Sequence, residues 1–154
     1  VRPLLRQGFF FLQEIVMKIL LPLVTILFMT STVYAGDCPQ IRNTKKAPAS
    51  FQKLDKTAKA NKINGKDLFH KTAKPLACKM CHGKTGDGNG VLGKALSPKP
   101  RNFTCIDTMK DISAGQMYWI IKNGSKGTGM AAQKFLKPKE IWDIVKYIRE
   151  DLSK

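Results

Sequence analysis

The sequence predicts an all-α domain in which the first and last helices pack across each other. Apolar residues recur at helical spacing near the C-terminus. A second helix is expected in the middle of the folded part, between Ser113, which can cap the start of a helix, and Gly124, which can end one. No run of strands is apparent in the pattern of apolar residues. The length, 154 residues, suits one small domain with a segment before it.

Residues 1–35 have the pattern of a secretory signal peptide, with an apolar run at 19–29 and the small-residue end Val33-Tyr34-Ala35. Met17 is a candidate start, which would leave residues 1–16 upstream of the true start. The run of 11 strongly apolar residues is short for a membrane span, which needs about 18. We therefore expect export to the periplasm; the alternative is an N-terminal membrane anchor with the domain facing the periplasm.

Residues 36–62 form a basic N-terminal segment, rich in Lys, Ala, Thr, Pro and Asn and poor in apolar residues. Such a composition predicts a tail or a loosely attached segment. The folded domain is expected in residues 63–154. Without the leader the chain has a net charge of +14, from 24 Lys and Arg against 10 Asp and Glu.

The first helix is expected over residues 64–73, with Asn64 as its N-cap. Pro75 ends it, because proline cannot continue the hydrogen-bond ladder of a helix. Gly65 and Phe69 lie four residues apart and so share one face. A glycine on that face would let another helix approach closely, with Phe69 filling the crossing.

The next stretch, Cys78-Lys79-Met80-Cys81-His82, has the C-x-x-C-H pattern of covalent haem attachment. On one helical turn Cys78 and Cys81 share a face, so each can form a thioether to one haem vinyl group. His82 follows directly and is a candidate axial iron ligand. A zinc ribbon would need a second C-x-x-C, and a thioredoxin-type redox pair would need a βαβ context. We therefore predict one covalent haem c.

Cys38 and Cys105 remain once the motif has taken its two cysteines. Export to an oxidising compartment would allow a disulfide between them. The required separation of their Cα atoms cannot be tested from sequence. A disulfide and two free thiols are both open at this point.

Residues 83–90 contain four glycines and show no period, which predicts a loop whose backbone wraps around a flat cofactor. A phosphate-binding loop is disfavoured because no strand precedes it. Residues 97–103 contain two prolines and read as extended chain. The carbonyl of Pro98 or Pro100 is a candidate acceptor for the second ring N–H of His82; a plain rigid connector is the alternative.

Two longer helices are expected after this connector. Ser113 and Gln116 form a capping box that opens one of them, and Gly124 stops it. Pro138 suits the first turn of the last helix, whose apolar residues keep helical spacing to the end. Tyr147 on this helix could meet Gly65 and Phe69, so that the domain closes by packing its terminal helices together.

Met130 follows three glycines and is the candidate for the axial position opposite His82. Met80 lies within the attachment turn, and Met117 is expected in a buried helix position. Met109 is the competing candidate. His70 precedes the motif on the first helix and is expected to lie on the wrong side of the haem.

These features resemble the class I c-type cytochromes over about residues 63–152. The resemblance rests on Cys78-Lys79-Met80-Cys81-His82, on Gly127-Thr128-Gly129-Met130, and on the pairing of Gly65 and Phe69 with Tyr147. It implies the small cytochrome c fold around one covalent haem, with Cys78 and Cys81 as anchors and His82 and Met130 as axial ligands. The basic N-terminal segment and the two additional cysteines depart from the family's pattern.

The function expected from this resemblance is electron transfer by a single haem c that cycles between the ferric and ferrous states. The protein would then not be an enzyme, and it would have no catalytic residues. One alternative is an electron-entry subunit of a larger oxidoreductase. A less favoured alternative is a haem enzyme or sensor with a labile sixth ligand.

The basic charge predicts a redox protein partner with an acidic docking surface. Lys79, Lys84 and Lys126 are expected near the exposed haem edge by their proximity in the chain. An exported protein rarely meets nucleic acid, so no nucleic acid is expected as a partner. A membrane is expected only as the location of a partner, and the protein is expected to be a monomer.

Overall fold

The computed structural model describes residues 38–154, and every regular element among them is helical. The predicted all-α class is confirmed. The signal peptide expected in residues 1–35 and the start at Met17 lie outside the described residues. Within residues 38–154, no helix has the length and apolar character needed to cross a membrane. The elements in chain order are α2 (Ala49–Gln52), η1 (Thr57–Lys59), α3 (Lys62–Asp67), η2 (Leu68–Thr72), α4 (Lys79–His82), η3 (Gly93–Ala95), α5 (Ile106–Met109), α6 (Ala114–Asn123), α7 (Pro138–Tyr147) and η4 (Ile148–Leu152).

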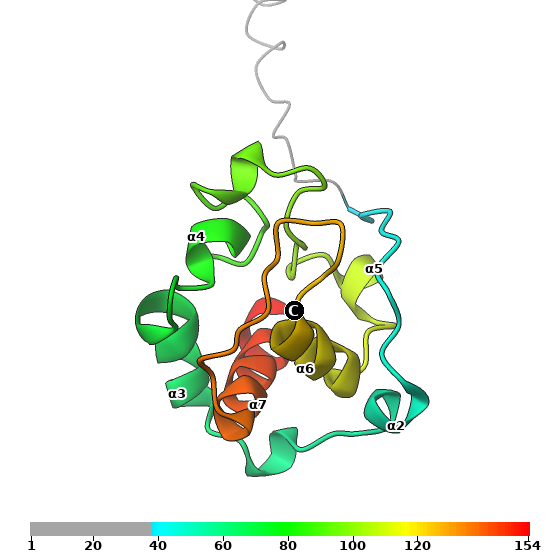
Figure 1. Ribbon diagram of the computed structural model, residues 1–154, viewed down its shortest axis with the longest axis vertical. Helices are drawn as coiled ribbons and strands as arrows, with labels where there is room; N and C mark the ends of the chain where they lie inside the picture. The colour runs from blue at the N-terminus through cyan, green and yellow to red at the C-terminus, as the bar shows by residue number, and fades with distance from the viewer. Residues whose placement is uncertain (1–37) are drawn as a thin grey trace, which may run out of the picture. The chain divides into compact units, whose positions relative to one another are not determined.

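The terminal helices α3 and α7 pack against each other, as the sequence predicted (Figure 1). Gly65 of α3 lies against the backbone of α7, where a Cβ atom would overlap the carbonyl group of Asp143. One turn further on, Phe69 is fully buried and its ring centroid lies 5.5 Å from that of Tyr147. Helix α6 covers another side of α7 through the stacked rings of Tyr118 and Trp142, whose centroids are 4.5 Å apart.

The N-cap of the helix expected over residues 64–73 lies three residues earlier than predicted. The cap is Asn61, whose side-chain oxygen accepts the backbone N–H of Asn64 at 3.1 Å. Asn64 therefore lies inside α3 and is not its cap. Both asparagines have the chemistry of a cap, and a long-range contact decides between them, because the Asn64 side chain is used to reach α7.

That contact is made to Asp143 of α7, whose side chain is completely buried. Its carboxylate accepts the backbone N–H of Asn61 at 2.7 Å, the side-chain amide of Asn64 at 2.8 Å and the ammonium group of Lys139 at 3.2 Å. Burial raises the pKa of the Asp143 carboxyl, but these hydrogen bonds outweigh burial, and the pKa lies below its usual range. A buried carboxylate thus joins the start of α3 to the middle of α7.

Replacing Asp143 with alanine is expected to lower the free energy of unfolding by about 3 kcal/mol, because it leaves buried donors without an acceptor. The unfolded chain binds the proton of this carboxyl more readily than the folded chain does. Its stabilising contribution is therefore complete above the ordinary pKa of about 4 and is lost as the pH falls through the lower folded value. Denaturant titrations at several pH values would check this. A difference between wild type and Asp143→Ala that stays constant from pH 6 to pH 3 would contradict it.

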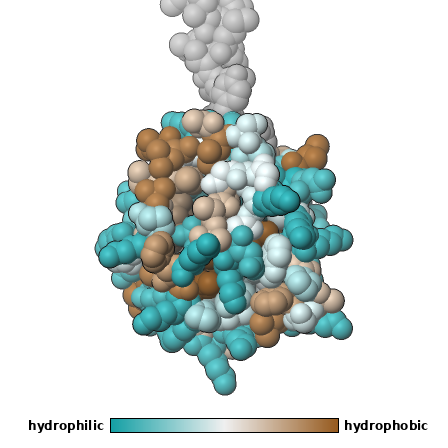
Figure 2. All heavy atoms as spheres, in the orientation of Figure 1, coloured by the Kyte–Doolittle hydropathy of each residue, from teal (hydrophilic) through white to brown (hydrophobic). Residues whose placement is uncertain are grey.

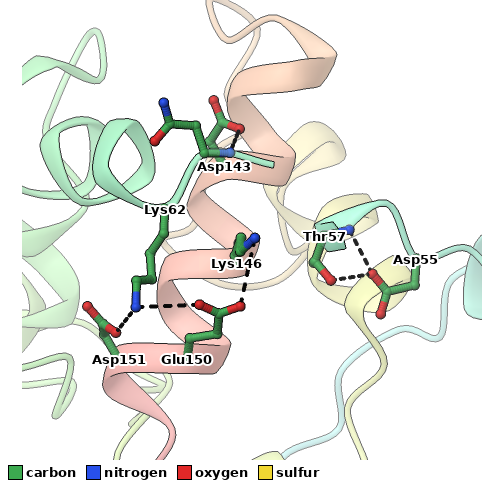
Figure 3. Close-up of polar contacts among 8 residues, drawn as sticks. Asp55, Thr57, Lys62, Asp143, Lys146, Glu150 and Asp151 are labelled. Atoms are coloured by element: carbon green, nitrogen blue, oxygen red, sulfur yellow. Dashed lines mark hydrogen bonds and ion pairs between the residues drawn. The ribbon is translucent and has the colours of Figure 1, made fainter. Parts of the chain in front are cut away.

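Ion pairs at the surface also connect the terminal helices. The ammonium group of Lys62 lies 3.0 Å from Asp151 and 3.5 Å from Glu150, which in turn lies 4.0 Å from Lys146 (Figure 3). These side chains are mostly part-exposed, and exposed pairs of this kind contribute little to stability. The crossing is stabilised mainly by the buried contacts of Gly65, Phe69 and Asp143.

The basic N-terminal segment is not a loose tail in its described part, residues 38–62, so that prediction is wrong. Contacts of Gln116 explain part of the difference between the predicted loose tail and the observed ordered segment. Ser113 caps α6 as predicted, because its Oγ accepts the Gln116 N–H at 3.1 Å. The Gln116 side chain, however, reaches the N-terminal segment, where it accepts the Ala47 N–H at 2.7 Å and donates to the Lys45 carbonyl at 3.1 Å. Composition predicted a solvated segment, but specific long-range hydrogen bonds hold it in place.

Candidate functional site

The short helix α4 carries the attachment motif. Cys78 is its N-cap residue, and the backbone N–H of His82 donates to the Cys78 carbonyl at 2.9 Å, closing one helical turn. Gly83 ends the turn with a φ of 84°, a conformation that glycine adopts at little cost. Cys78, Cys81 and His82 all line one cavity. The single turn therefore presents both thiols and the imidazole to the same space, as the motif predicts.

His82 is buried and held from two sides. Its ring stacks on that of Phe103, with centroids 4.6 Å apart. Its Nδ1 donates to the backbone carbonyl of Arg101 at 3.1 Å. The acceptor predicted from sequence was Pro98 or Pro100, so the prediction was off by one residue from Pro100. The prolines predict extended chain, but packing determines which carbonyl faces the ring.

This hydrogen bond determines the chemistry of the imidazole. Because a carbonyl only accepts, Nδ1 carries the hydrogen and Nε2 keeps a free lone pair, the form that binds metals. Burial lowers the pKa of His82 to about 4; the bond to the Arg101 carbonyl opposes this, and the charges of Arg101 and Arg42 add to it. At neutral pH the ring is therefore uncharged and able to coordinate a metal.

The thiols of Cys78 and Cys81 are free, that is, not part of a disulfide. Burial raises the pKa of the Cys78 thiol to about 11, and burial also raises the pKa of Cys81. A thioredoxin-type redox pair needs a nucleophilic cysteine with a lowered pKa. The electrostatics therefore disfavour a redox dithiol and leave thioether formation as the chemistry that fits the site. Within residues 38–154, no three His, Cys, Asp or Glu side chains are grouped closely enough to hold a metal ion.

The cavity has a volume of about 1230 Å³, and apolar atoms form most of its lining. Met130, Met109 and Met117 all line it, so burial in this cavity does not by itself select one thioether. His70 is not among the lining residues. Its Nε2 is hydrogen-bonded to the Tyr147 hydroxyl at 2.8 Å. His70 is thus a hydrogen-bonded histidine that lies outside the cavity lining.

Met130 differs from the other two methionines in its backbone. Met109 and Met117 lie on helices α5 and α6, whereas Met130 ends a small hydrogen-bonded loop. The Met130 carbonyl accepts the Ser125 N–H at 2.9 Å, and its own N–H donates to Thr128 Oγ1 at 3.1 Å. Figure 1 shows this segment between α6 and α7 as an arch above the end of α6. The half-buried Met130 is therefore held on a defined loop at the cavity.

The glycine-rich loop at residues 83–90 does not wrap around the cavity as predicted. None of its residues is among the cavity lining. Instead, a Cβ atom at Gly90 would overlap the backbone of α4, and the Gly90 N–H donates to the Cys81 carbonyl at 3.1 Å. These glycines allow the loop to pack closely on the attachment turn. The loop of residues 83–90 therefore packs against α4, and other segments line the cavity.

Residues 38–47 contribute a wall of the cavity that sequence reasoning missed. Gln40, Ile41, Arg42 and Thr44 line it. Cys38 and Cys105 form a disulfide, with Cα atoms 5.6 Å apart, which resolves the question left open by the sequence. The pair of cysteines outside the motif was the available signal, but sequence did not show which part of the domain the segment would cover.

The residues present fit a haem c. The cavity is larger than the 300–1,000 Å³ typical of small-molecule sites. Its apolar walls suit a large aromatic macrocycle. Two protonated thiols on one turn suit two thioether bonds, and a neutral imidazole with a free Nε2 suits iron. Of the three lysines expected near the haem edge, Lys126 lines the cavity, whereas Lys79 and Lys84 do not.

A family model described as cytochrome c matches residues 63–150, more than half of the chain. No curated protein sequence matches the chain. Among solved structures, a chain of a reducing HAO-like protein complex from Kuenenia stuttgartiensis is similar, with 24% sequence identity and a TM-score of 0.48. The similarity covers 59% of this chain and 42% of that chain, so this chain spans less than half the length of that relative.

Proposed function

The chain belongs to the cytochrome c family, and from this premise we propose that it transfers electrons by means of a single haem c with His82 and Met130 as axial ligands. The observation that carries the proposal is the cavity that Cys78, Cys81, His82 and Met130 share. Haem c bound there would supply one-electron chemistry between ferric and ferrous iron. We propose no catalytic residues, because electron transfer needs none.

Cys78, Cys81, His82 and Met130 each have a defined part in the proposed function. The Cys78 and Cys81 thiols would hold the haem by two thioether bonds. Each thiol would form one sulfur–carbon bond to a vinyl group and give its hydrogen to the neighbouring carbon, so no oxidant is required. His82 is oriented by the Arg101 carbonyl and offers Nε2 to the iron. Met130 offers a thioether, which favours a high reduction potential. The apolar walls of the cavity exclude water.

Optical spectroscopy of the purified protein in both redox states tests the proposal. The protein should be made in a host with working cytochrome-maturation enzymes. We expect the absorption bands of haem c in the oxidised and reduced states, at one haem per chain. A colourless protein from such a host would refute the proposed function.

Replacing Met130 with alanine is expected to abolish the ferric iron–sulfur charge-transfer band, because the thioether that gives rise to it would be gone. Near-infrared and visible spectra of the ferric protein would measure this. Met109→Ala and Met117→Ala are matched controls, since both residues line the same cavity. If the band persists in Met130→Ala and disappears in one of these controls, that methionine is the ligand.

We propose a redox protein with an acidic surface as the partner, on the basis of the net charge of +14 that the chain has without the leader. We expect the rate of electron transfer to an acidic partner to fall several-fold between low and physiological ionic strength, because salt screens the attraction between the surfaces. Stopped-flow kinetics at several salt concentrations would measure this. Rates that do not change with ionic strength would contradict an electrostatic docking surface.

A second candidate function is that of an electron-entry subunit bound to a larger oxidoreductase. Exposed apolar side chains favour it, among them Leu76, Val91, Leu92 and Phe135. Figure 2 shows apolar atoms gathered toward the upper left of the visible face, where Figure 1 has the segments around α4, while hydrophilic side chains spread over the rest. Chromatography of the native protein from its source would separate the two functions. A free carrier elutes alone as a monomer, whereas a subunit elutes with its enzyme.

We propose that the protein acts in the periplasm. The leader-like residues 1–35 and the Cys38–Cys105 disulfide support this location, because structural disulfides form and persist in oxidising compartments. An N-terminal anchor facing the periplasm is the alternative. Fractionation of the source cells distinguishes them: an exported carrier is released with the periplasmic contents, and an anchored one stays with the membranes.

A further inference from the structure

The segment of residues 38–47, here called the strap, lies outside the part of the chain that matches the cytochrome c family. It is nevertheless built into the cofactor cavity. In Figure 1 it is the cyan segment that runs beside α5 toward α2. Because the strap lines this cavity, it is a candidate part of the cofactor site, although it lies outside the residues that match the family.

The strap is held at both of its ends. The Cys38–Cys105 disulfide joins its start to the residue before α5. Next to it, the Gln40 side chain donates to the Pro100 carbonyl at 3.2 Å and accepts the Asn102 N–H at 2.8 Å. At its far end Ala47 is hydrogen-bonded to Gln116. The residues between these anchors are therefore held against the cavity.

Arg42, in the middle of the strap, lines the cavity together with Arg101. The Arg101 guanidinium donates to Thr44 Oγ1 at 2.9 Å, which fixes it against the strap. Arg42 and Arg101 thus bring two positively charged, half-buried side chains to the same cavity. Within residues 38–154, no carboxylate forms an ion pair with either of them.

Arg42 and Arg101 are partly withdrawn from water and line one cavity. A negatively charged group bound in that cavity would stabilise both positive charges. The acidic residues that also line the cavity are Asp107 and Asp111, and Asp107 is paired with Lys110 at 3.1 Å. A guanidinium group is the side chain best suited to bind a carboxylate through two parallel hydrogen bonds. Beside Arg42, Ile41 lines the same cavity while its own surface is fully exposed (101%). An occupant at the cavity edge would cover this apolar side chain.

We propose that Arg42 and Arg101 bind the carboxylate groups of the haem propionates, and that the strap is therefore part of the haem site of this protein. This inference rests on the proposed function, because it requires the haem. Arg42 reaches the propionates from the strap, and Arg101 reaches them from the segment whose carbonyl orients His82. The disulfide keeps the first of these cations in place.

The test uses three variants of the full-length holo-protein: Arg42→Gln, Arg42→Lys and Lys45→Gln. Lys45 is the matched control, because it lies on the same strap and carries the same charge, but its side chain is exposed and does not line the cavity. Haem content is measured first. Redox titration then gives the midpoint potential, and resonance Raman spectroscopy gives the propionate bending band, which reports hydrogen bonding to the carboxylates.

In Arg42→Gln we expect a shifted propionate band and a lower midpoint potential, because a positive charge that favours ferrous iron is lost. At a fixed ambient potential the ratio of ferrous to ferric protein should fall on the order of three- to tenfold. Arg42→Lys should recover most of the potential but little of the band position, since lysine keeps the charge without the paired donors. Lys45→Gln should match wild type in both measurements.

An Arg42→Gln protein with normal haem content, and with the band and potential of Lys45→Gln, would overturn the inference while leaving the proposed function intact. A wild-type protein without haem would instead refute the proposed function. If Arg42→Gln does not mature, Arg42→Lys decides: a shifted propionate band supports binding by Arg42, and an unchanged band contradicts it.

Discussion

A variant with serine at both Cys78 and Cys81 is expected to retain no haem after acid–organic extraction, whereas the unaltered chain is expected to retain its haem. The two thiols line the same cavity and are the cysteines of the described chain that stay free of a disulfide. Intact mass and absorbance before and after extraction would measure the loss. The single variant Cys81→Ser should keep its haem through one thioether.

The same double variant is expected to lose its cooperative thermal transition. A cavity of about 1230 Å³ lies beside α4, α5 and α6, and its apolar walls need a packing partner. The haem supplies that partner, so the chain without it should be poorly ordered. Circular dichroism during heating would show this. A double variant that keeps its haem on extraction, or that unfolds as cooperatively as wild type, would contradict the assignment of the motif.

Replacing both Cys38 and Cys105 with serine is expected to lower the free energy of unfolding of the holo-protein by about 4 kcal/mol. The disulfide joins residues 67 positions apart, and a cross-link of this span removes much of the entropy of the unfolded chain. Guanidinium titrations of the holo-protein would measure the change, since the covalent haem stays attached throughout.

This variant is also the matched control for the first prediction, because it removes the other cysteine pair of the described chain. It should keep a full complement of covalent haem after extraction. A change in stability below about 1 kcal/mol would show that the hydrogen bonds of Gln40 and Gln116 hold the strap without the disulfide.

The helices that were predicted correctly have strong local signals. Ser113 opens α6, Gly124 stops it at a φ of 75°, and Pro138 stands in the first turn of α7. The crossing of the terminal helices followed from one glycine opposite a run of apolar residues. These features depend on neighbours within about one helical turn, so they can be recognised in the sequence.

Two of the errors share one physical cause. Asn61 and Asn64 are both suitable caps, and Asp143, some 80 residues later, takes the side chain of the second one. Gln116 has the right position for a capping box, and its amide is used by the N-terminal segment instead. In each case a polar side chain had two possible partners, and the distant partner was visible only in the folded chain.

In the candidate site, too, the features with a local cause could be predicted from sequence, and those that depend on distant contacts could not. The spacing of Cys78, Cys81 and His82 predicts that one helical turn brings their side chains to one face, and all three line the same cavity. The choice of the Arg101 carbonyl, the packing of the glycine-rich loop behind α4, and the strap with Arg42 required contacts between segments far apart in the chain. The residues for attachment are adjacent in the sequence, so a short motif is enough to recognise them. The walls and charges around the cofactor come from distant segments that only tertiary packing brings together.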